Sequence, residues 1–225
     1  KRDLQKRLNE SNFPWITSNV KLKSKGKEIP FYKETANGKI DLPETYIYHT
    51  EDEDGTKIKI GFFSVCVPSN PVDYVTYGSM FINAKKSYNA LKGKVDVVFG
   101  LTHVKIADDK KIATLLPNVP LIMGGHEHTN SNNFVGNVQI SKADANAKTV
   151  YIHRISYDKK TKETSVKSEL KEINSSIKKD KKVGEVVAKW QNILKTKIKE
   201  IISNPDEIIY NAKVPLDGRD APIRS

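Results

Sequence analysis

The sequence predicts an α/β fold, and three observations carry the prediction. Between Ile58 and Met123, apolar segments of strand length alternate with segments of helical period. After Met123 the pattern changes to alternation of period two, and a long amphipathic helix follows. Alternating strands and helices are typical of a sheet whose strands pair at least partly in parallel.

The composition is that of a folded chain that crosses no bilayer. The 225 residues are 37% hydrophobic and 29% charged, which is enough to bury a core, and no stretch reaches the roughly 20 apolar residues of a membrane span. The single cysteine, Cys66, excludes an internal disulfide framework and a multi-cysteine zinc site. The net charge is +11, but 33 of the 38 basic residues are lysines in scattered short runs. Because sequence-reading nucleic-acid interfaces favour arginine, we interpret these lysines as a solvated surface able to attract a phosphorylated substrate.

Before Pro68, the sequence predicts one helix and three strands. Leu4 and Leu8 recur at helical spacing, and an acidic turn at 51–55 separates two runs typical of strands. The expected elements are a helix that ends before residue 12 and strands at 13–20, 46–49 and 57–67.

Two helices, each followed by a strand, are expected between Pro68 and Met123. Gly93 and Pro117 end the helices, and the strands are almost wholly apolar, as strands covered on both faces should be. The helices are expected at 81–91 and 107–116, and the strands at 95–101 and 121–123.

The remainder predicts a meander of three strands, then a long amphipathic helix and a linker. The strands are expected at 134–140, 149–157 and 163–169, the helix at 183–202, and a linker or a broken strand at 207–225.

Three of the five histidines follow predicted strands. His103 follows the strand at 95–101, and His126 and His128 follow the next strand in the sequence Gly-Gly-His-Glu-His. Ligand sites of α/β sheets lie beyond the carboxyl ends of the strands, so these three imidazoles should meet at one edge. A His-x-His spacing in extended chain directs both rings to one side, where one ion or two adjacent ions can be bound.

The residues around these histidines receive structural interpretations. Gly124 and Gly125 are expected to let the backbone turn tightly, with positive φ. Asp108 and Asp109 open a helix and are interpreted as capping or dipole-stabilising residues. Cys66 is interpreted as a core residue, since no histidine near it in sequence activates it.

Several segments resemble the 5′-nucleotidase-type metallophosphoesterases. Leu101-Thr102-His103 and the run Pro-Asn-Val-Pro-Leu-Ile-Met-Gly-Gly-His-Glu-His-Thr at 117–129 look like the second half of that family's catalytic domain. Residues 13–20 resemble the segment after the family's Gly-Asn-His-Glu motif, and residues 142–144 and 214–219 match in character. The resemblance covers nearly the whole chain, in order.

The resemblance implies half of a metallophosphoesterase β-sandwich flanked by helices, in αββα layers. Residues 1–180 would be a partial catalytic domain, and residues 181–225 a long helix and linker toward a C-terminal nucleotide-binding domain. Relatives act in the periplasm, at the cell wall or outside the cell, which implies an extracytoplasmic location.

The reaction that the resemblance implies is hydrolysis of a nucleotide or another phosphate ester by two divalent metal ions. The ions polarise the phosphoryl oxygens and lower the pKa of a bridging water, and zinc, manganese or iron would suit imidazole ligands. Carried over by motif, His103 and His126 ligate one metal and His128 the other. Glu127 is a spacer whose side chain points away from its flanking histidines.

The sequence departs from the family by lacking its upstream Asp-x-His, Gly-Asp and Gly-Asn-His-Glu motifs. These supply the carboxylate and asparagine ligands and the histidine that assists the leaving group, so the catalytic residues stay unassigned here. We expect this chain to supply part of a site, to be inactive as a phosphatase alone, and to need an N-terminal half and a C-terminal domain as partners.

Other functions remain open at this point. A half-domain could act as a non-catalytic binding or assembly module, and a basic nucleic-acid binder would lose DNA affinity steeply with salt. A mononuclear zinc site made of the same three histidines and a water is a further variant, although no general base is evident for it. His49 and His153 are interpreted as surface or satisfied core residues.

Overall fold

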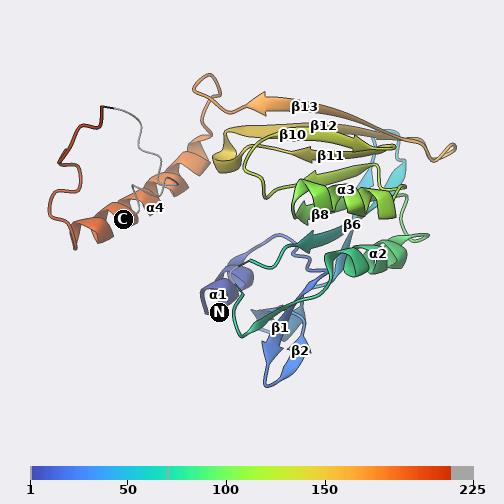
Figure 1. Cartoon of the computed structure of the whole chain (residues 1–225), viewed down its shortest axis with the longest axis horizontal. Coiled ribbons are helices and arrows are strands. Elements are labelled where there is room, and N and C mark those ends of the chain that lie inside the picture. Colours follow the sequence, from blue (N-terminus) through green and yellow to red (C-terminus); the bar gives the residue numbers. More distant parts are fainter. Residues whose placement is uncertain (1, 70, 214–225) are drawn as a thin grey trace. The chain divides into compact units, whose positions relative to one another are not determined.

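The computed structural model describes residues 2–69 and 71–213 of the chain (Figure 1). The chain divides into two compact units, Lys1–Asn174 and Ser175–Ser225. The first unit contains every sheet of the described residues, and the second contains one helix.

A six-stranded mixed sheet forms the centre of the first unit, with the order β10-β11-β9-β8-β6-β5. Four strands, β6, β8, β9 and β11, pair in parallel, and β5 and β10 add antiparallel edges. The predicted α/β class with partly parallel pairing is therefore confirmed. The bounds are β5 Thr45–Glu51, β6 Lys57–Cys66, β8 Val97–His103, β9 Leu121–Gly124, β10 Ser131–Val135 and β11 Val138–Lys142.

Two helices cover one face of this sheet. They are α2, Met80–Leu91, which begins after the N-cap Ser79, and α3, Ile106–Leu115. Their apolar sides pack on alternate residues of the strands, and the shared core includes Phe63, Ile112 and Ile122, none of which exposes measurable surface. Burying such side chains contributes about 1.5–3 kcal/mol each.

A two-stranded antiparallel sheet covers part of the opposite face. It consists of β12, Thr149–Tyr157, and β13, Thr164–Glu172. Tyr157 and Val166 of this hairpin pack against Val97, Phe99 and Leu121 of the central sheet. The layers are therefore helices, central sheet and a second, smaller sheet, which is the expected half of a β-sandwich flanked by helices.

Polar contacts also attach the hairpin to the central sheet. Gln139 of β11 is buried, and its Nε2 donates to Ser168 Oγ of β13 at 2.7 Å and to Asn132 Oδ1 at 2.8 Å. Ser168 Oγ in turn lies 2.7 Å from Nδ1 of His153. The two sheets are thus joined both by apolar packing at Tyr157 and Val166 and by hydrogen bonds at Gln139 and Ser168.

The N-terminal part forms a small layer with its own core, built from Leu8, Leu22, Phe31 and Leu42. Its strands between residues 20 and 41 are three to five residues long and rich in lysine, so the apolar alternation that predicts a strand is weak there. The elements are α1 Arg2–Glu10, β1 Val20–Ser24, β2 Lys27–Ile29, β3 Tyr32–Thr35, β4 Gly38–Asp41 and β7 Val75–Tyr77.

The second unit contains α4, Lys181–Lys199, whose N-cap Asp180 accepts a hydrogen bond from the Val183 amide at 2.9 Å. The expected helix at 183–202 is thus present with shifted ends. Residues 203–213 contain no helix or strand, and the rest of the expected linker, 214–225, lies outside the described residues. Across the described residues, no helix has both the length and the apolar content to span a membrane.

The expected strand at 13–20 is wrong. Residues 11–19 are irregular, and β1 begins only at Val20. The backbone amides of Thr17 and Ser18 donate instead to Pro43 and Ser64, which belong to different segments, so this stretch bridges two layers and does not join one ladder.

The expected three-stranded meander is also wrong. Residues 134–140 are split by a tight turn in which Gly136 has a φ of 56°, so two strands, β10 and β11, replace one. β11 then joins β9 in parallel, while β12 and β13 pair only with each other among the described strands.

The half-buried His153 predicts a pH dependence of stability. Burial lowers the pKa of His153 from its ordinary value of 6.5. The unfolded chain therefore takes up the proton first, and stability should fall as the pH drops below about 6.5. Urea unfolding at pH 7.5, 6.5 and 5.5 should show this loss, and it should be smaller in His153→Gln but unchanged in His49→Gln. Identical pH slopes for the wild type and His153→Gln would contradict the assignment.

Candidate functional site

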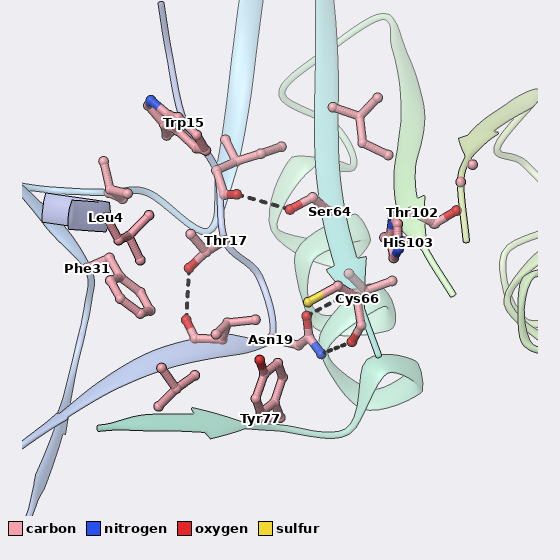
Figure 2. A pocket seen from close by; sticks show the side chains of 18 of the residues that line it. Leu4, Trp15, Thr17, Asn19, Phe31, Ser64, Cys66, Tyr77, Thr102 and His103 are labelled. Atoms are coloured by element: carbon pink, nitrogen blue, oxygen red, sulfur yellow. Dashed lines mark hydrogen bonds between the residues drawn. The ribbon is translucent and has the colours of Figure 1, made fainter. Parts of the chain in front are cut away.

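The carboxyl ends of three parallel strands lie side by side at one edge of the central sheet. Cys66 at the end of β6 pairs in register with His103 at the end of β8, and Thr102 pairs with Gly124 at the end of β9. Figure 2 shows Cys66 and His103 on these neighbouring strands. The edge at which the histidines were expected is therefore formed.

Alternation along the strands separates two kinds of residue at this edge. Thr102, Gly124 and Lys142 follow the same alternation as the residues packed beneath α2 and α3. Cys66 and His103 follow the other alternation and belong to the opposite face, the one that β12 and β13 partly cover. The imidazole of His103 thus lies on one face and a lysine on the other.

The structure brings two of the predicted ligands together. The rings of His103 and His126 have centroids 5.5 Å apart and meet edge to face at 84°. His128 lies two residues further along the same loop, where its carbonyl accepts a hydrogen bond from the Ala145 amide at 3.1 Å. Within residues 2–69 and 71–213, no three His, Cys, Asp or Glu side chains are gathered closely enough to hold a metal ion.

Both histidines of the loop have left-handed backbone conformations. The φ angle is 91° at His126 and 63° at His128. Positive φ was expected at Gly124 and Gly125, but neither glycine has it. Such backbone costs about 1–3 kcal/mol per residue and is concentrated at functional sites. The glycines are needed for space: a Cβ on Gly124 would lie 2.9 Å from Cε of Lys142, and one on Gly125 would lie 3.1 Å from Nδ1 of His103.

Hydrogen bonds hold both ends of this loop. The Gly125 amide donates to the Thr102 carbonyl at 2.9 Å. Beyond His128, the Asn130 amide and side chain donate to the carboxylate of Asp144 at 2.9 and 2.8 Å. Asp144 also accepts from Thr149 Oγ1 at 2.7 Å, which ties the loop to the start of β12.

A buried ion-pair cluster lies beneath the middle of the loop. The ammonium of Lys142 contacts the carboxylates of Glu127 and Asp109, the latter at 2.8 Å, and donates to the carbonyl of Val104. Glu127 also accepts from the amide of Ile106, the first residue of α3, so its side chain points to α3 and β11. Lys142 and Asp109 expose 1% and 0% of their side chains.

The two carboxyl groups of the cluster have opposite pKa shifts. Burial raises the pKa of Asp109 more than the contact with Lys142 lowers it. For Glu127, burial also acts upward, but hydrogen bonds from Lys142 and the Ile106 amide outweigh it, and the pKa is lowered. Asp108 and Asp109 lie in the first turn of α3, as expected of dipole-stabilising residues, but neither caps the helix, because its N-cap position is Lys105 and no side chain caps it. The carboxyl group of Asp109 is buried against Lys142, and Asp108 pairs with Lys111 at 3.6 Å.

A cavity of about 580 Å³ opens beside His103 (Figure 2). Its lining is mostly apolar and aromatic and includes Trp15, Phe31 and Met123. Two polar groups in its wall are already engaged: Thr17 Oγ1 donates to the Val20 carbonyl at 2.9 Å, and Ser64 Oγ donates to the Ile16 carbonyl at 3.1 Å. The cavity therefore favours apolar contents, and His103 is the one histidine among the described residues of its lining.

The side chain of Asn19 is hydrogen-bonded to the backbone of Cys66, a contact that the sequence did not predict. The side chain of Asn19 accepts from the Cys66 amide at 3.0 Å and donates to the Cys66 carbonyl at 2.8 Å, which fixes the end of β6. Burial raises the pKa of the Cys66 thiol, consistent with the core interpretation, although its neighbour in the sheet is His103. The register, which local sequence does not encode, creates this pair.

The other two histidines lie elsewhere. His49 is exposed and pairs with Lys59, near the start of β6, while the site lies at the end of β6. His153 belongs to β12 and contacts Ser168.

Solved structures share this fold. A putative 5′-nucleotidase from Staphylococcus aureus matches 85% of the chain with a TM-score of 0.61 and 12% identity, and the match covers 38% of that protein. The sulfate thiohydrolase SoxB from Thermus thermophilus matches 85% with a TM-score of 0.64 and 14% identity, and the match covers 34% of it. The chain thus spans little more than a third of the length of either protein. No protein-family model and no curated protein sequence matches the chain.

These likenesses show that the chain shares the fold of part of a putative 5′-nucleotidase and of part of SoxB. The sequence-based resemblance to the 5′-nucleotidase-type metallophosphoesterases is confirmed at the level of fold.

The close approach at Gly124 predicts a costly substitution. In Gly124→Ala the new methyl group would displace Lys142, which is fully buried and held by three partners, so we expect a loss of about 1–3 kcal/mol in unfolding free energy. Urea unfolding can be followed by Trp15 fluorescence in a Trp190→Phe background, since these are the two tryptophans of the chain.

Gly184→Ala is the matched control, because Gly184 lies in α4 and a Cβ added there would have no atom within 4 Å. It should leave the Trp15 transition unchanged. An unaltered transition in Gly124→Ala would show that Lys142 is not confined as described.

Proposed function

We propose that the chain belongs to a metal-dependent phosphoester hydrolase of the 5′-nucleotidase kind and that His103, His126 and His128 are metal ligands. The observation that carries the proposal is the edge-to-face pair of His103 and His126, at 5.5 Å, on the carboxyl ends of adjacent parallel strands. Ligand sites of open α/β sheets lie at such edges. The shared fold with a putative nucleotidase and a thiohydrolase supports the same reading.

The donor set fits a divalent transition metal only in part. Imidazole suits zinc, manganese or iron, but two adjacent rings are fewer ligands than a catalytic site needs. No larger cluster exists in the described part of the chain. The remaining ligands, carboxylates above all, would come from further polypeptide, of the same protein or of a partner.

Bound at this edge, divalent ions would polarise the phosphoryl oxygens and activate a water for attack. The chain's own contribution is to hold the imidazoles. The buried cluster holds Glu127 between them and so supports the positive φ angles of His126 and His128. The net charge of +11 favours the approach of an anionic substrate.

The substrate we propose is a nucleotide or another phosphate ester, in an extracytoplasmic location. Both follow from the resemblance of the motifs at 101–103 and 117–129. The apolar cavity beside His103 offers few free polar groups, so recognition of the substrate's sugar or base would rest on other parts of the complete protein.

Metal titration tests the ligand assignment. Calorimetric titration of the chain with Zn²⁺ should show binding that weakens at least about tenfold, or about 1.4 kcal/mol, in His126→Ala and in His103→Ala. The control His49→Ala removes an exposed imidazole outside the site and should bind as the wild type does. Equal affinities in all four proteins would contradict the assignment.

Hydrolysis tests whether the described residues suffice. Because the site lacks further ligands, we expect the purified chain to release no phosphate from 4-nitrophenyl phosphate or from nucleoside monophosphates with Zn²⁺ or Mn²⁺ present. Hydrolysis that disappears in His126→Ala would overturn the partial-site proposal.

The same samples distinguish the alternative of a non-catalytic assembly module. Such a module should self-associate or bind a partner to the same extent with and without a chelator. Sedimentation velocity in the presence of EDTA and of Zn²⁺ tests for such association. Equal self-association in both conditions, together with no zinc binding in the calorimetric titration, would favour the module over the metal site.

A further inference from the structure

Lys142 is a buried cation whose position stability alone does not explain. Its side chain is 1% exposed at the end of β11, and its ammonium contacts Glu127, Asp109 and the Val104 carbonyl. Burying charges is costly, and a buried ion pair seldom adds net stability over an apolar group of the same size. Such a cluster is better explained by what it holds in place.

Glu127 connects this cluster to the loop. It lies between His126 and His128, and one carboxylate oxygen accepts from the Ile106 amide while the other contacts Lys142. Both neighbours have positive φ, a conformation that persists only where the surroundings enforce it. The anchored side chain of Glu127 therefore lies at the midpoint of the strained segment.

The support comes from the face opposite to the imidazole of His103. Lys142 and Thr102 follow the alternation of the helix-covered face, and Gly124 leaves the space through which the lysine stem passes, since a Cβ would lie 2.9 Å from Lys142 Cε. Asp109 of α3 closes the cluster from below. The loop is thereby held at its centre from beneath, while hydrogen bonds hold its ends.

We infer that Lys142, held by Asp109, is a positioning residue that acts through Glu127 to fix the backbone of His126 and His128 and so to orient the imidazole of His126 toward His103. Asp144, two residues further along the chain, fixes the far end of the same loop through Asn130. The Lys-Ala-Asp segment at 142–144 thus holds the loop that contains Gly-Gly-His-Glu-His at two points, Glu127 and Asn130. The positioning itself needs no metal; its consequence for metal affinity rests on the proposed function.

The test is the cross-relaxation between the ring protons of His103 and His126 in the metal-free chain, measured by NMR. The wild type should show a cross-peak, because the ring centroids lie 5.5 Å apart and meet edge to face. Glu127→Ala should lose most of it, and Glu127→Gln, which retains one acceptor oxygen, should give an intermediate intensity. Partial rescue by glutamine is not expected from a general loss of stability.

Lys142→Met and a control complete the set. Lys142→Met should reduce the cross-peak as Glu127→Ala does; if it fails to fold, Glu127→Ala decides, since Lys142 keeps Asp109 and the Val104 carbonyl there. Gln139→Met breaks a buried network on the same strand but on the other face, so it should be destabilised and keep the cross-peak. A full cross-peak in folded Glu127→Ala would overturn the inference.

Zinc affinity of the same variants separates this inference from the proposed function. If the wild type binds zinc, Glu127→Ala should bind it about tenfold more weakly. A wild type that binds no zinc, but whose cross-peak depends on Glu127, would refute the proposed metal site and leave the positioning intact. If the wild type binds zinc but its cross-peak is the same in Glu127→Ala, the positioning role is refuted and the proposed metal site is retained.

Discussion

Parallel pairing of β6, β8 and β9 in register brings three strand ends to one edge, and the remaining features of the site depend on it. Residues far apart in the chain, such as Cys66 and His103, become neighbours only because these strands run in the same direction. The two-residue period of a strand then assigns each side chain to a face. His103 is presented on one face, and Lys142 supports the loop from the other.

Strain and support balance each other in the loop after β9. Left-handed histidines are unfavourable, and a buried lysine with two carboxylates is costly to desolvate. The cost of burying Lys142 and the cost of the left-handed histidines have one explanation, because Glu127 lies between the two histidines and pairs with Lys142. Burial raises the pKa of Asp109, whereas for Glu127 hydrogen bonds from Lys142 and the Ile106 amide outweigh burial and lower the pKa. Gly124 is small for the same reason, because the lysine stem occupies the space of its side chain.

The layers around the sheet contribute unequally to the site. The helices α2 and α3 bury a continuous apolar core and supply Asp109 and the Ile106 amide. The N-terminal layer adds the apolar wall of the cavity and, through Asn19, clamps the end of β6. The hairpin of β12 and β13 is joined to the central sheet partly through the polar Gln139 network and pairs with no other described strand. The buried ion-pair cluster therefore lies where the helix layer meets the strand ends, and the imidazole of His103 lies on the opposite face of the sheet.

The sequence by itself determined the elements whose side-chain period is strong. The strands that end at Cys66 and His103 and the helices α2 and α3 lie close to where apolar periodicity predicted them. His126 and His128 follow β9 as expected, whereas His103 is the last residue of β8 and does not lie beyond it. Tertiary structure alone decided the pairing of Lys142 with Asp109, the left-handed backbone of the histidines and the irregular path before Val20. The physical reason is range: periodicity is a property of neighbouring residues, whereas a buried lysine or an unpaired amide takes its partner from whichever distant segment the sheet order brings beside it.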